Sequence, residues 1–193
     1  MPTKKTKLVL FASGNGSNAE NIVRYFRKQE TAEVALILTN NPKAFVIQRA
    51  ASLGVDCKVI TRDDFKQAGS LITDLRKKQI DFIVLAGFLW LIPEALIKAF
   101  PNKILNIHPA LLPKYGGKGM YGNFVHQAVS DARETQTGIS IHYVNAAYDE
   151  GDILFQKTVT IKAGEDPEHI AEKVHQLEYD YYPKVIENLL IKA

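Results

Sequence analysis

The sequence contains a single cysteine, Cys57, among 193 residues, so no disulfide can form within the chain. Such a chain suits a reducing compartment, and we expect the cytoplasm. No apolar run reaches the roughly 18 residues that a membrane helix requires. Residues 1–7 lead directly into an apolar run that is too short for the core of a secretory signal. We therefore expect no association with a membrane.

The charge balance gives no sign of a nucleic-acid partner. The chain has 24 Lys and Arg against 21 Asp and Glu, and its formal net charge is only +3. None of the five histidines shows the spacing to a second ligand that predicts a zinc site, so we expect no metal. We expect small-molecule substrates, and the sequence leaves a monomer and a homodimer equally open.

Short β-branched runs alternate with helical patterns through the first hundred residues. We expect strands at 7–12, 34–39, 56–60, 82–86 and 104–108, with helices at 18–28, 44–53, 64–78 and 93–99 between them. This alternation produces right-handed βαβ units. It predicts an α/β fold with a mainly parallel, twisted, Rossmann-like sheet and helices on both faces.

The pattern changes after residue 113. Residues 114–122 contain four glycines and no apolar periodicity, which predicts a loop. We expect this loop to be a mobile lid over the site, and a passive surface loop is the alternative. A helix at 121–130, an antiparallel strand pair at 137–143 and 153–161, and a closing helix at 166–190 follow, with Pro183 as a candidate break in that helix. We see no repeat and no linker, so we expect one domain.

The segment NIHPALLP at 106–113 places two reactive side chains at a strand end. Side chains alternate along a strand, so Asn106 and His108 point to the same side, and Pro109 ends the ladder. The carboxyl ends of strands in open α/β sheets are where ligands bind. An amide can donate to an oxyanion and an imidazole can move protons. A purely structural histidine is the alternative.

Residues 13–18 read SGNGSN and form a glycine-rich loop before the first expected helix. Free N–H groups at a helix start favour an anion, so we interpret the loop as a site for a monophosphate. A dinucleotide site would need a carboxylate at the end of the second strand. That strand ends in Thr39-Asn40-Asn41. A dinucleotide site and a structural turn are the alternatives.

An acidic turn at 148–152 holds the remaining candidate. A carboxylate beside His108 would raise its pKa and orient its ring. The residues alone do not choose among Asp149, Glu150 and Asp152, and a hairpin turn without function is the alternative.

Several segments in order resemble the phosphoribosylglycinamide formyltransferases, a family of folate-dependent formyltransferases. They are SGNGSN at 13–18, LAGF at 85–88, NIHPALLPKY at 106–115, TGISIHYV at 137–144, YDEGDILFQ at 148–156, and Glu178 before Tyr182-Pro183. The resemblance implies transfer of a formyl group from 10-formyltetrahydrofolate, a co-substrate, to the amine of N1-(5-phospho-D-ribosyl)glycinamide in de novo purine biosynthesis. It implies no metal.

The resemblance also implies roles for individual residues. The implied catalytic set is Asn106, His108 and Asp149, with His108 held as a cation by Asp149. The implied ribonucleotide contacts are Gly14, Asn15, Gly16, Ser17, Asn18 and Glu178. The implied folate contacts are Leu89, Trp90, Leu91, Ile92, Asn106, Asn145, Ala146, Ala147, Tyr148 and Asp149. We expect residues 1–100 to form the nucleotide-binding half, and 101–193 the catalytic and folate-binding half, of one domain.

Two points stay open on the sequence. Trp90 stands where related chains often have arginine, and both Arg62 and Lys66 are candidates for the folate tail. Three other functions also share features with this chain. They are hydrolysis of the formyl-folate, formylation of methionyl-tRNA, and nucleotide binding without catalysis. We expect the tRNA function to require an additional RNA-binding domain.

Overall fold

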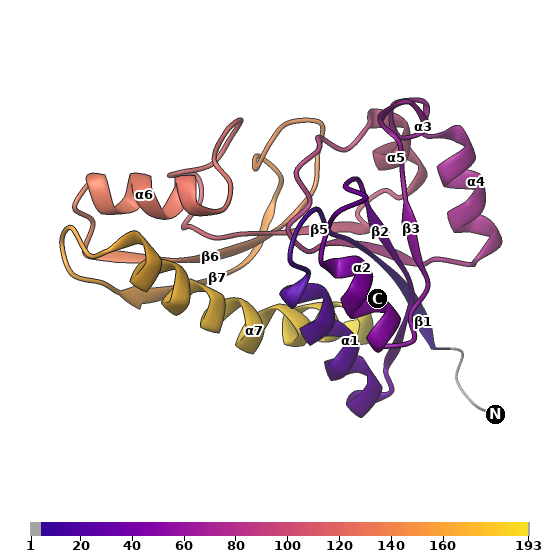
Figure 1. Cartoon of the computed structure of the whole chain (residues 1–193), viewed down its shortest axis with the longest axis horizontal. Coiled ribbons are helices and arrows are strands. Elements are labelled where there is room, and N and C mark those ends of the chain that lie inside the picture. The colour runs from indigo at the N-terminus through magenta and orange to yellow at the C-terminus, as the bar shows by residue number, and fades with distance from the viewer. Residues whose placement is uncertain (1–4, 193) are drawn as a thin grey trace.

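The computed structural model describes residues 5–192 and is built on one twisted, seven-stranded sheet (Figure 1). The strand order is β3-β2-β1-β4-β5-β6-β7. Neighbours from β3 to β5 are parallel, and β6 and β7 continue the sheet in antiparallel pairing. The predicted α/β fold is confirmed. The expectation for the start of the chain falls partly on residues 1–4, which lie outside the described residues.

The elements of the parallel part follow the predicted alternation. In chain order they are β1 (Thr6–Phe11), α1 (Ser17–Gln29), β2 (Ala32–Thr39), α2 (Val46–Ser52), β3 (Cys57–Val59), α3 (Arg62–Gln67), α4 (Gly69–Lys77), β4 (Phe82–Leu85), α5 (Glu94–Ala99) and β5 (Ile104–His108). The rest of the chain forms α6 (Asn123–Asp131), β6 (Gln136–Tyr143), β7 (Ile153–Thr160) and α7 (Pro167–Lys192). No helix within residues 5–192 is both long and apolar enough to cross a bilayer.

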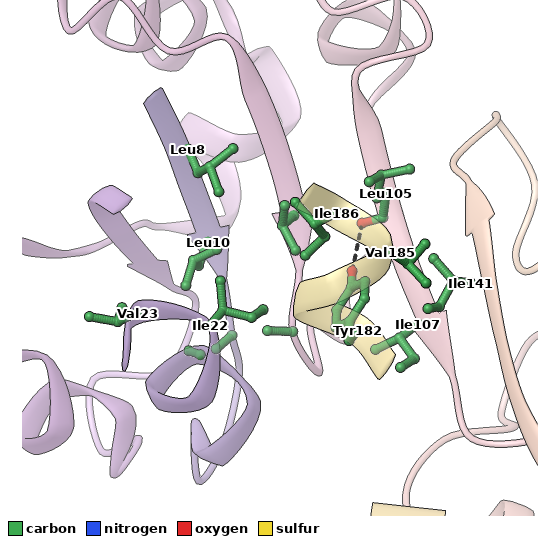
Figure 2. Close-up of a cluster of buried hydrophobic side chains, with 14 of the residues drawn as sticks. Leu8, Leu10, Ile22, Val23, Leu105, Ile107, Ile141, Tyr182, Val185 and Ile186 are labelled. Atoms are coloured by element: carbon green, nitrogen blue, oxygen red, sulfur yellow. Dashed lines mark hydrogen bonds between the residues drawn. The ribbon is translucent and has the colours of Figure 1, made fainter. Parts of the chain in front are cut away.

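The central strands of the sheet are buried on both faces, which is why they are apolar at nearly every position. Leu8 and Leu10 of β1 join a cluster that includes residues of α1, α2 and α7. Val9 and Phe11 point the other way and join a cluster with α3, α4 and α5. Figure 2 shows Tyr182 of α7 packed against β5 in the first cluster. Its buried hydroxyl lies 2.9 Å from the carbonyl oxygen of Leu85.

The strand order positions the ligand site. β1 lies between β2 and β4, so the chain reverses its direction of progress across the sheet at β1. Crevices at the carboxyl ends of strands next to such a reversal are the usual ligand sites of open α/β sheets. The glycine loop follows β1, the segment 86–92 follows β4, and His108 ends β5. The three predicted segments therefore meet at one edge.

The predicted helix at 64–78 is wrong, because it is two helices separated at Ala68. Ala68 has a left-handed φ of 52°, and α4 restarts at Gly69. Phe65 and Leu71 are six positions apart, so an unbroken helix would point them roughly 120° away from each other. The break lets both residues enter the same buried cluster. Burial has overridden the continuous helical pattern.

Helix α7 continues through Pro183 and is not broken there. Proline cannot donate to the carbonyl four residues earlier, which here belongs to Tyr179. Asn21 of α1 donates its side-chain N–H to that carbonyl oxygen at 2.9 Å. The contact supplies the hydrogen bond that proline removes and ties α7 to α1.

Candidate active site

The carboxyl edge of the sheet encloses a cavity of about 710 Å³. Its wall contains residues of all three predicted groups, which are far apart in the sequence. The whole wall consists of residues 13–18, 85–92, 106–109, 117–122 and 147–149, with His126, His142, Val144, His175 and Glu178. Asn145 and Ala146 were predicted to contact folate but are not part of the wall. Asn145 instead accepts a hydrogen bond from the backbone of Ala147 and shapes the turn.

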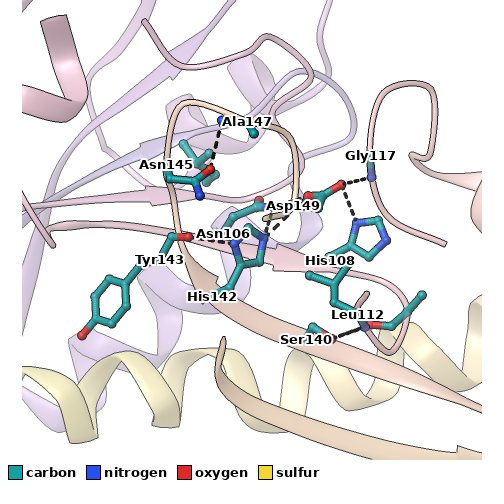
Figure 3. Close-up of polar contacts among 12 residues, drawn as sticks. Asn106, His108, Leu112, Gly117, Ser140, His142, Tyr143, Asn145, Ala147 and Asp149 are labelled. Atoms are coloured by element: carbon teal, nitrogen blue, oxygen red, sulfur yellow. Dashed lines mark hydrogen bonds and ion pairs between the residues drawn. The ribbon is translucent and has the colours of Figure 1, made fainter. Parts of the chain in front are cut away.

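Two of the predicted catalytic residues lie on β5, beside the antiparallel strand β6. The pairing register places Asn106 opposite His142 and His108 opposite Ser140. Directly paired residues of an antiparallel ladder share a face, so these four side chains gather on one side (Figure 3). Ser140 is fully buried, and its hydroxyl accepts from the backbone N–H of Leu112 at 2.9 Å. This contact fixes the turn that follows His108.

Asp149 is the carboxylate of the acidic turn that reaches this cluster. One oxygen lies 3.5 Å from Nδ1 of His108, and the other lies 3.4 Å from Nδ2 of Asn106. The backbone N–H of Gly117 also donates to Asp149, at 3.0 Å (Figure 3). Glu150 and Asp152 are exposed. Of the three acidic residues that the sequence left open, Asp149 is thus the one that the structure places beside His108.

His108 has a hydrogen-bond acceptor at each ring nitrogen. Nδ1 faces Asp149, and Nε2 donates to the backbone carbonyl of Tyr115 at 2.7 Å. The ring is only 3% exposed, and this burial lowers the pKa of His108 although both acceptors act to raise it. The direction of this shift argues against the expectation that His108 rests as a cation. Desolvation outweighs the neighbouring carboxylate.

His142 is a site residue that the sequence analysis missed as such. It is 2% exposed, and its Nε2 lies 3.1 Å from Nδ2 of Asn106 and 3.6 Å from Asp149. Nδ1 donates to the carbonyl oxygen of Tyr143 at 2.9 Å. A signal was present, because the expected strand 137–143 puts His142 and Ser140 on one face. Only the β5–β6 register shows which residues they oppose.

The glycine loop is held tightly at the start of α1. Gly16 has a φ of 76°, and a Cβ atom there would lie 2.4 Å from Cγ2 of Val46. Glycine is therefore required at this position by packing alone. The side-chain oxygen of Asn15 accepts from Arg49 at 2.7 Å, so its side chain is engaged in holding the loop. Ser17 begins α1, next to the cavity.

Asn18 and Glu178 form a buried polar pair in the cavity wall. The amide of Asn18 donates to Glu178 at 2.8 Å. Burial raises the pKa of Glu178 to about 7, although this hydrogen bond lowers it. The side-chain oxygen of Asn18 is buried without a hydrogen-bond partner among residues 5–192. Buried polar atoms are normally paired, so an unpaired acceptor in a cavity wall indicates a place for a donor group.

The segment after β4 is anchored to the glycine loop. The hydroxyl of Ser13 accepts from the backbone N–H of Leu89 at 2.9 Å. Trp90 packs against Phe65 and Phe88, and the guanidinium of Arg62 lies 5.2 Å from the centre of its ring. Of the two candidates for the folate tail, Arg62 is thus next to a residue of the cavity wall. Within residues 5–192 no three His, Cys, Asp or Glu side chains are grouped as a metal would need.

Comparison with known proteins identifies the family. Residues 6–186 match the model of the formyl transferase family, which is most of the chain. The chain belongs to the formyl transferase family. Related proteins match this chain in sequence over nearly its whole length. The "Phosphoribosylglycinamide formyltransferase" of Bacillus subtilis is 35% identical over 189 residues, which are 95% of this chain and 94% of that protein.

Solved structures of family members share the fold. "Glycinamide ribonucleotide transformylase 1" from Geobacillus kaustophilus aligns with a TM-score of 0.87 at 36% identity, covering 97% of this chain and 100% of that one. The protein of the same name from Symbiobacterium toebii aligns with a TM-score of 0.89 at 27% identity, covering 97% and 89%. The mainly parallel sheet with antiparallel terminal strands is thus the fold of this family.

Plant members of the family are longer than this chain. The "Phosphoribosylglycinamide formyltransferase, chloroplastic" of Arabidopsis thaliana is 40% identical over 189 residues, which are 95% of this chain but 65% of that protein. The Vigna unguiculata protein of the same name is 38% identical, and the chain spans 61% of it.

Proposed function

We propose that this chain transfers the formyl group of 10-formyltetrahydrofolate to the amine of N1-(5-phospho-D-ribosyl)glycinamide, a step of de novo purine biosynthesis. The observation that carries the proposal is the convergence of Asn106, His108 and Asp149 in a cavity that also contains the glycine loop and Glu178. The names of the related proteins support the same substrates. Residues 5–192 would then act as one formyltransferase unit without a metal.

The amine attacks the formyl carbon and forms a tetrahedral intermediate with a negatively charged oxygen. Asn106 donates an N–H to that oxygen, which stabilises the charge as it develops. The hydrogen bond from Asn106 to Asp149 is long, at 3.4 Å, and therefore weak. This N–H can leave the carboxylate and donate to the oxyanion instead.

His108 carries the proton from the amine to the folate. Its lowered pKa leaves the ring neutral near pH 7, so it can accept the proton that the attacking amine loses. Asp149 stabilises the imidazolium that forms. His108 then gives the proton to N10 of the folate as the bond from that nitrogen to the formyl carbon breaks. In the neutral ring the contact with the Tyr115 carbonyl puts the proton on Nε2, so the lone pair lies on Nδ1, which faces Asp149. Nε2 can accept the proton of the amine only after this carbonyl moves away and the ring proton passes to Nδ1, where Asp149 accepts a hydrogen bond from it.

The ribonucleotide and the folate occupy different parts of the cavity. The phosphate lies on the N–H groups of Gly14–Asn18 at the start of α1, where the helix dipole favours an anion. The ribose hydroxyls lie near Glu178 and the side-chain oxygen of Asn18, which has no hydrogen-bond partner among residues 5–192. The pterin lies between residues 89–92 and the turn that ends at Asp149.

The cellular setting is part of the same proposal. A single, half-buried cysteine and small polar substrates suit the cytoplasm. The substrates are small molecules, with no role for nucleic acid or a membrane. A monomer and a homodimer both suit a site that the chain encloses by itself.

The proposal is tested by measuring product formation with both substrates for the wild type and for Asn106→Ala. Loss of an oxyanion donor should reduce kcat about 10²- to 10³-fold with little loss of stability. A folded Asn106→Ala variant with nearly full activity would contradict the assignment. Formate released without a formylated ribonucleotide would indicate a hydrolase, and neither product would indicate a binding module.

A further inference from the structure

His142 is a buried histidine in the cavity wall that the mechanism above does not use. Its ring is 2% exposed and contacts two of the three proposed catalytic residues. Nδ1 of His142 contacts a backbone group, the carbonyl of Tyr143, whereas Nε2 faces the side chains of Asn106 and Asp149.

The contact with Tyr143 determines where the ring carries its proton. A carbonyl oxygen can only accept, so Nδ1 of His142 is the donor over this 2.9 Å contact. In the neutral ring the other nitrogen, Nε2, then carries a lone pair and is an acceptor. The group nearest to Nε2 is the amide of Asn106, at 3.1 Å, and an oxygen of Asp149 lies farther away, at 3.6 Å.

The lone pair on Nε2 in turn determines the orientation of the Asn106 amide. Only the NH₂ end can donate to Nε2, so the carbonyl end of the amide is turned away. The same nitrogen has a second hydrogen, which faces Asp149 over the longer contact of 3.4 Å. A rotated amide would present a lone pair to a developing oxyanion and would repel it.

We propose that His142 is a positioning residue that accepts a hydrogen bond through Nε2 and so keeps an N–H of Asn106 directed at the reacting formyl oxygen. The inference rests on the proposed function and assigns that site a further residue. The β5–β6 register supports it, because Asn106 and His142 are directly paired. His142 does not contact the substrates in this account, so its effect should fall on kcat and not on KM.

Two substitutions separate this role from packing. Glutamine places its side-chain oxygen near the position of Nε2, whereas asparagine places its polar atoms near Nδ1. His142→Gln should therefore keep kcat within about threefold of wild type. His142→Asn should lose roughly 10- to 100-fold in kcat, which is less than the loss of the donor itself. KM for both substrates should stay unchanged in both variants, and the same pair of substitutions at exposed His169 is the control.

A second measurement is independent of turnover. Nitrogen-15 NMR of the wild-type ring should show the proton of His142 on Nδ1 and a bare Nε2. Equal kcat for the two His142 variants, or a proton on Nε2 in the neutral ring, would overturn the inference. A wild type that shows the expected tautomer but makes no formylated ribonucleotide would instead contradict the proposed function, so the two failures are distinguishable.

Discussion

At the scale of single residues, the protonation of the proposed site depends on tertiary burial. Asn106 and His108 share one face of β5, because strand geometry alone requires it. Burial of the ring lowers the pKa of His108, and Asp149 and the Tyr115 carbonyl oppose this shift. No local pattern encodes that burial. The same holds for His142, whose role depends on a strand register.

Asp149→Asn tests the electrostatic part of the site. Burial lowers the pKa of His108 below its ordinary value of 6.5, and Asp149 opposes this shift. If His108 must start neutral, activity falls as pH decreases through that pKa. Removal of the carboxylate lowers the pKa further, so the midpoint of the acid limb of kcat should move to lower pH while the maximum rate falls. Identical midpoints in the two proteins would leave Asp149 as a turn residue.

Glu178→Gln tests the buried carboxyl through stability. The pKa of Glu178 is raised from 4.5 to about 7, so the protonated form is the one that folding favours. Its contribution to stability is complete below about pH 4.5 and is lost as pH rises through 7. At pH 8 the variant should gain up to about 3 kcal/mol over wild type in the free energy of unfolding, and little at pH 4.5.

Denaturant unfolding at both pH values measures this difference. Glu172→Gln is the matched control, since Glu172 lies on the same helix but is exposed. A gain for Glu178→Gln that is the same at both pH values would contradict the shifted pKa. The variant should also bind the ribonucleotide more weakly if Glu178 contacts the ribose.

At the scale of elements, most helices and strands were predicted within about two residues of their observed ends. The continuous helix predicted at 64–78 is wrong and the candidate break at Pro183 is absent, and both outcomes have tertiary causes. The α3–α4 break serves the burial of Phe65 and Leu71, and α7 tolerates Pro183 because Asn21 supplies the missing hydrogen bond. Both causes lie in another part of the fold. Periodicity within a window of residues carries no information about either.

The start of α1 is tested by placing a negative charge there. Ser17→Asp should repel the phosphate of the ribonucleotide and raise its KM much more than KM for the formyl-folate. Ser70→Asp is the control, because Ser70 lies in the first turn of α4 and is exposed. A similar change in KM for both substrates, or affinity for a nicotinamide dinucleotide, would contradict a monophosphate site.

The role of the loop 114–122 as a mobile lid stays a prediction. Gly117 and Gly119 have φ of 95° and 93°, which alanine rarely adopts, and a Cβ atom at either position meets open space. Gly117→Ala plus Gly119→Ala should therefore weaken the conformation that donates to Asp149 without creating a clash. A lid would lose kcat or release formate to water. Wild-type turnover and product ratio would mark the loop as passive.

At the scale of the whole molecule, the alternation of strands and helices was sufficient to predict the sheet and the edge that holds the site. Parallel strands deliver their carboxyl ends to one edge, so 13–18, 86–92 and 106–108 had to meet there. The contribution of α7 was harder to predict, since Glu178 reaches the cavity through the packing of that helix on α6, α1 and β6. The family resemblance, and not periodicity, selected Glu178.

The most direct test of the central claim is the fate of the formyl group in the wild-type protein. The protein is incubated with 10-formyltetrahydrofolate, with and without N1-(5-phospho-D-ribosyl)glycinamide, and formylated ribonucleotide and formate are both quantified by mass spectrometry. We predict that formylated ribonucleotide accounts for nearly all of the folate consumed, and that consumption almost stops without the acceptor. Formate as the main product in both incubations would contradict a transferase.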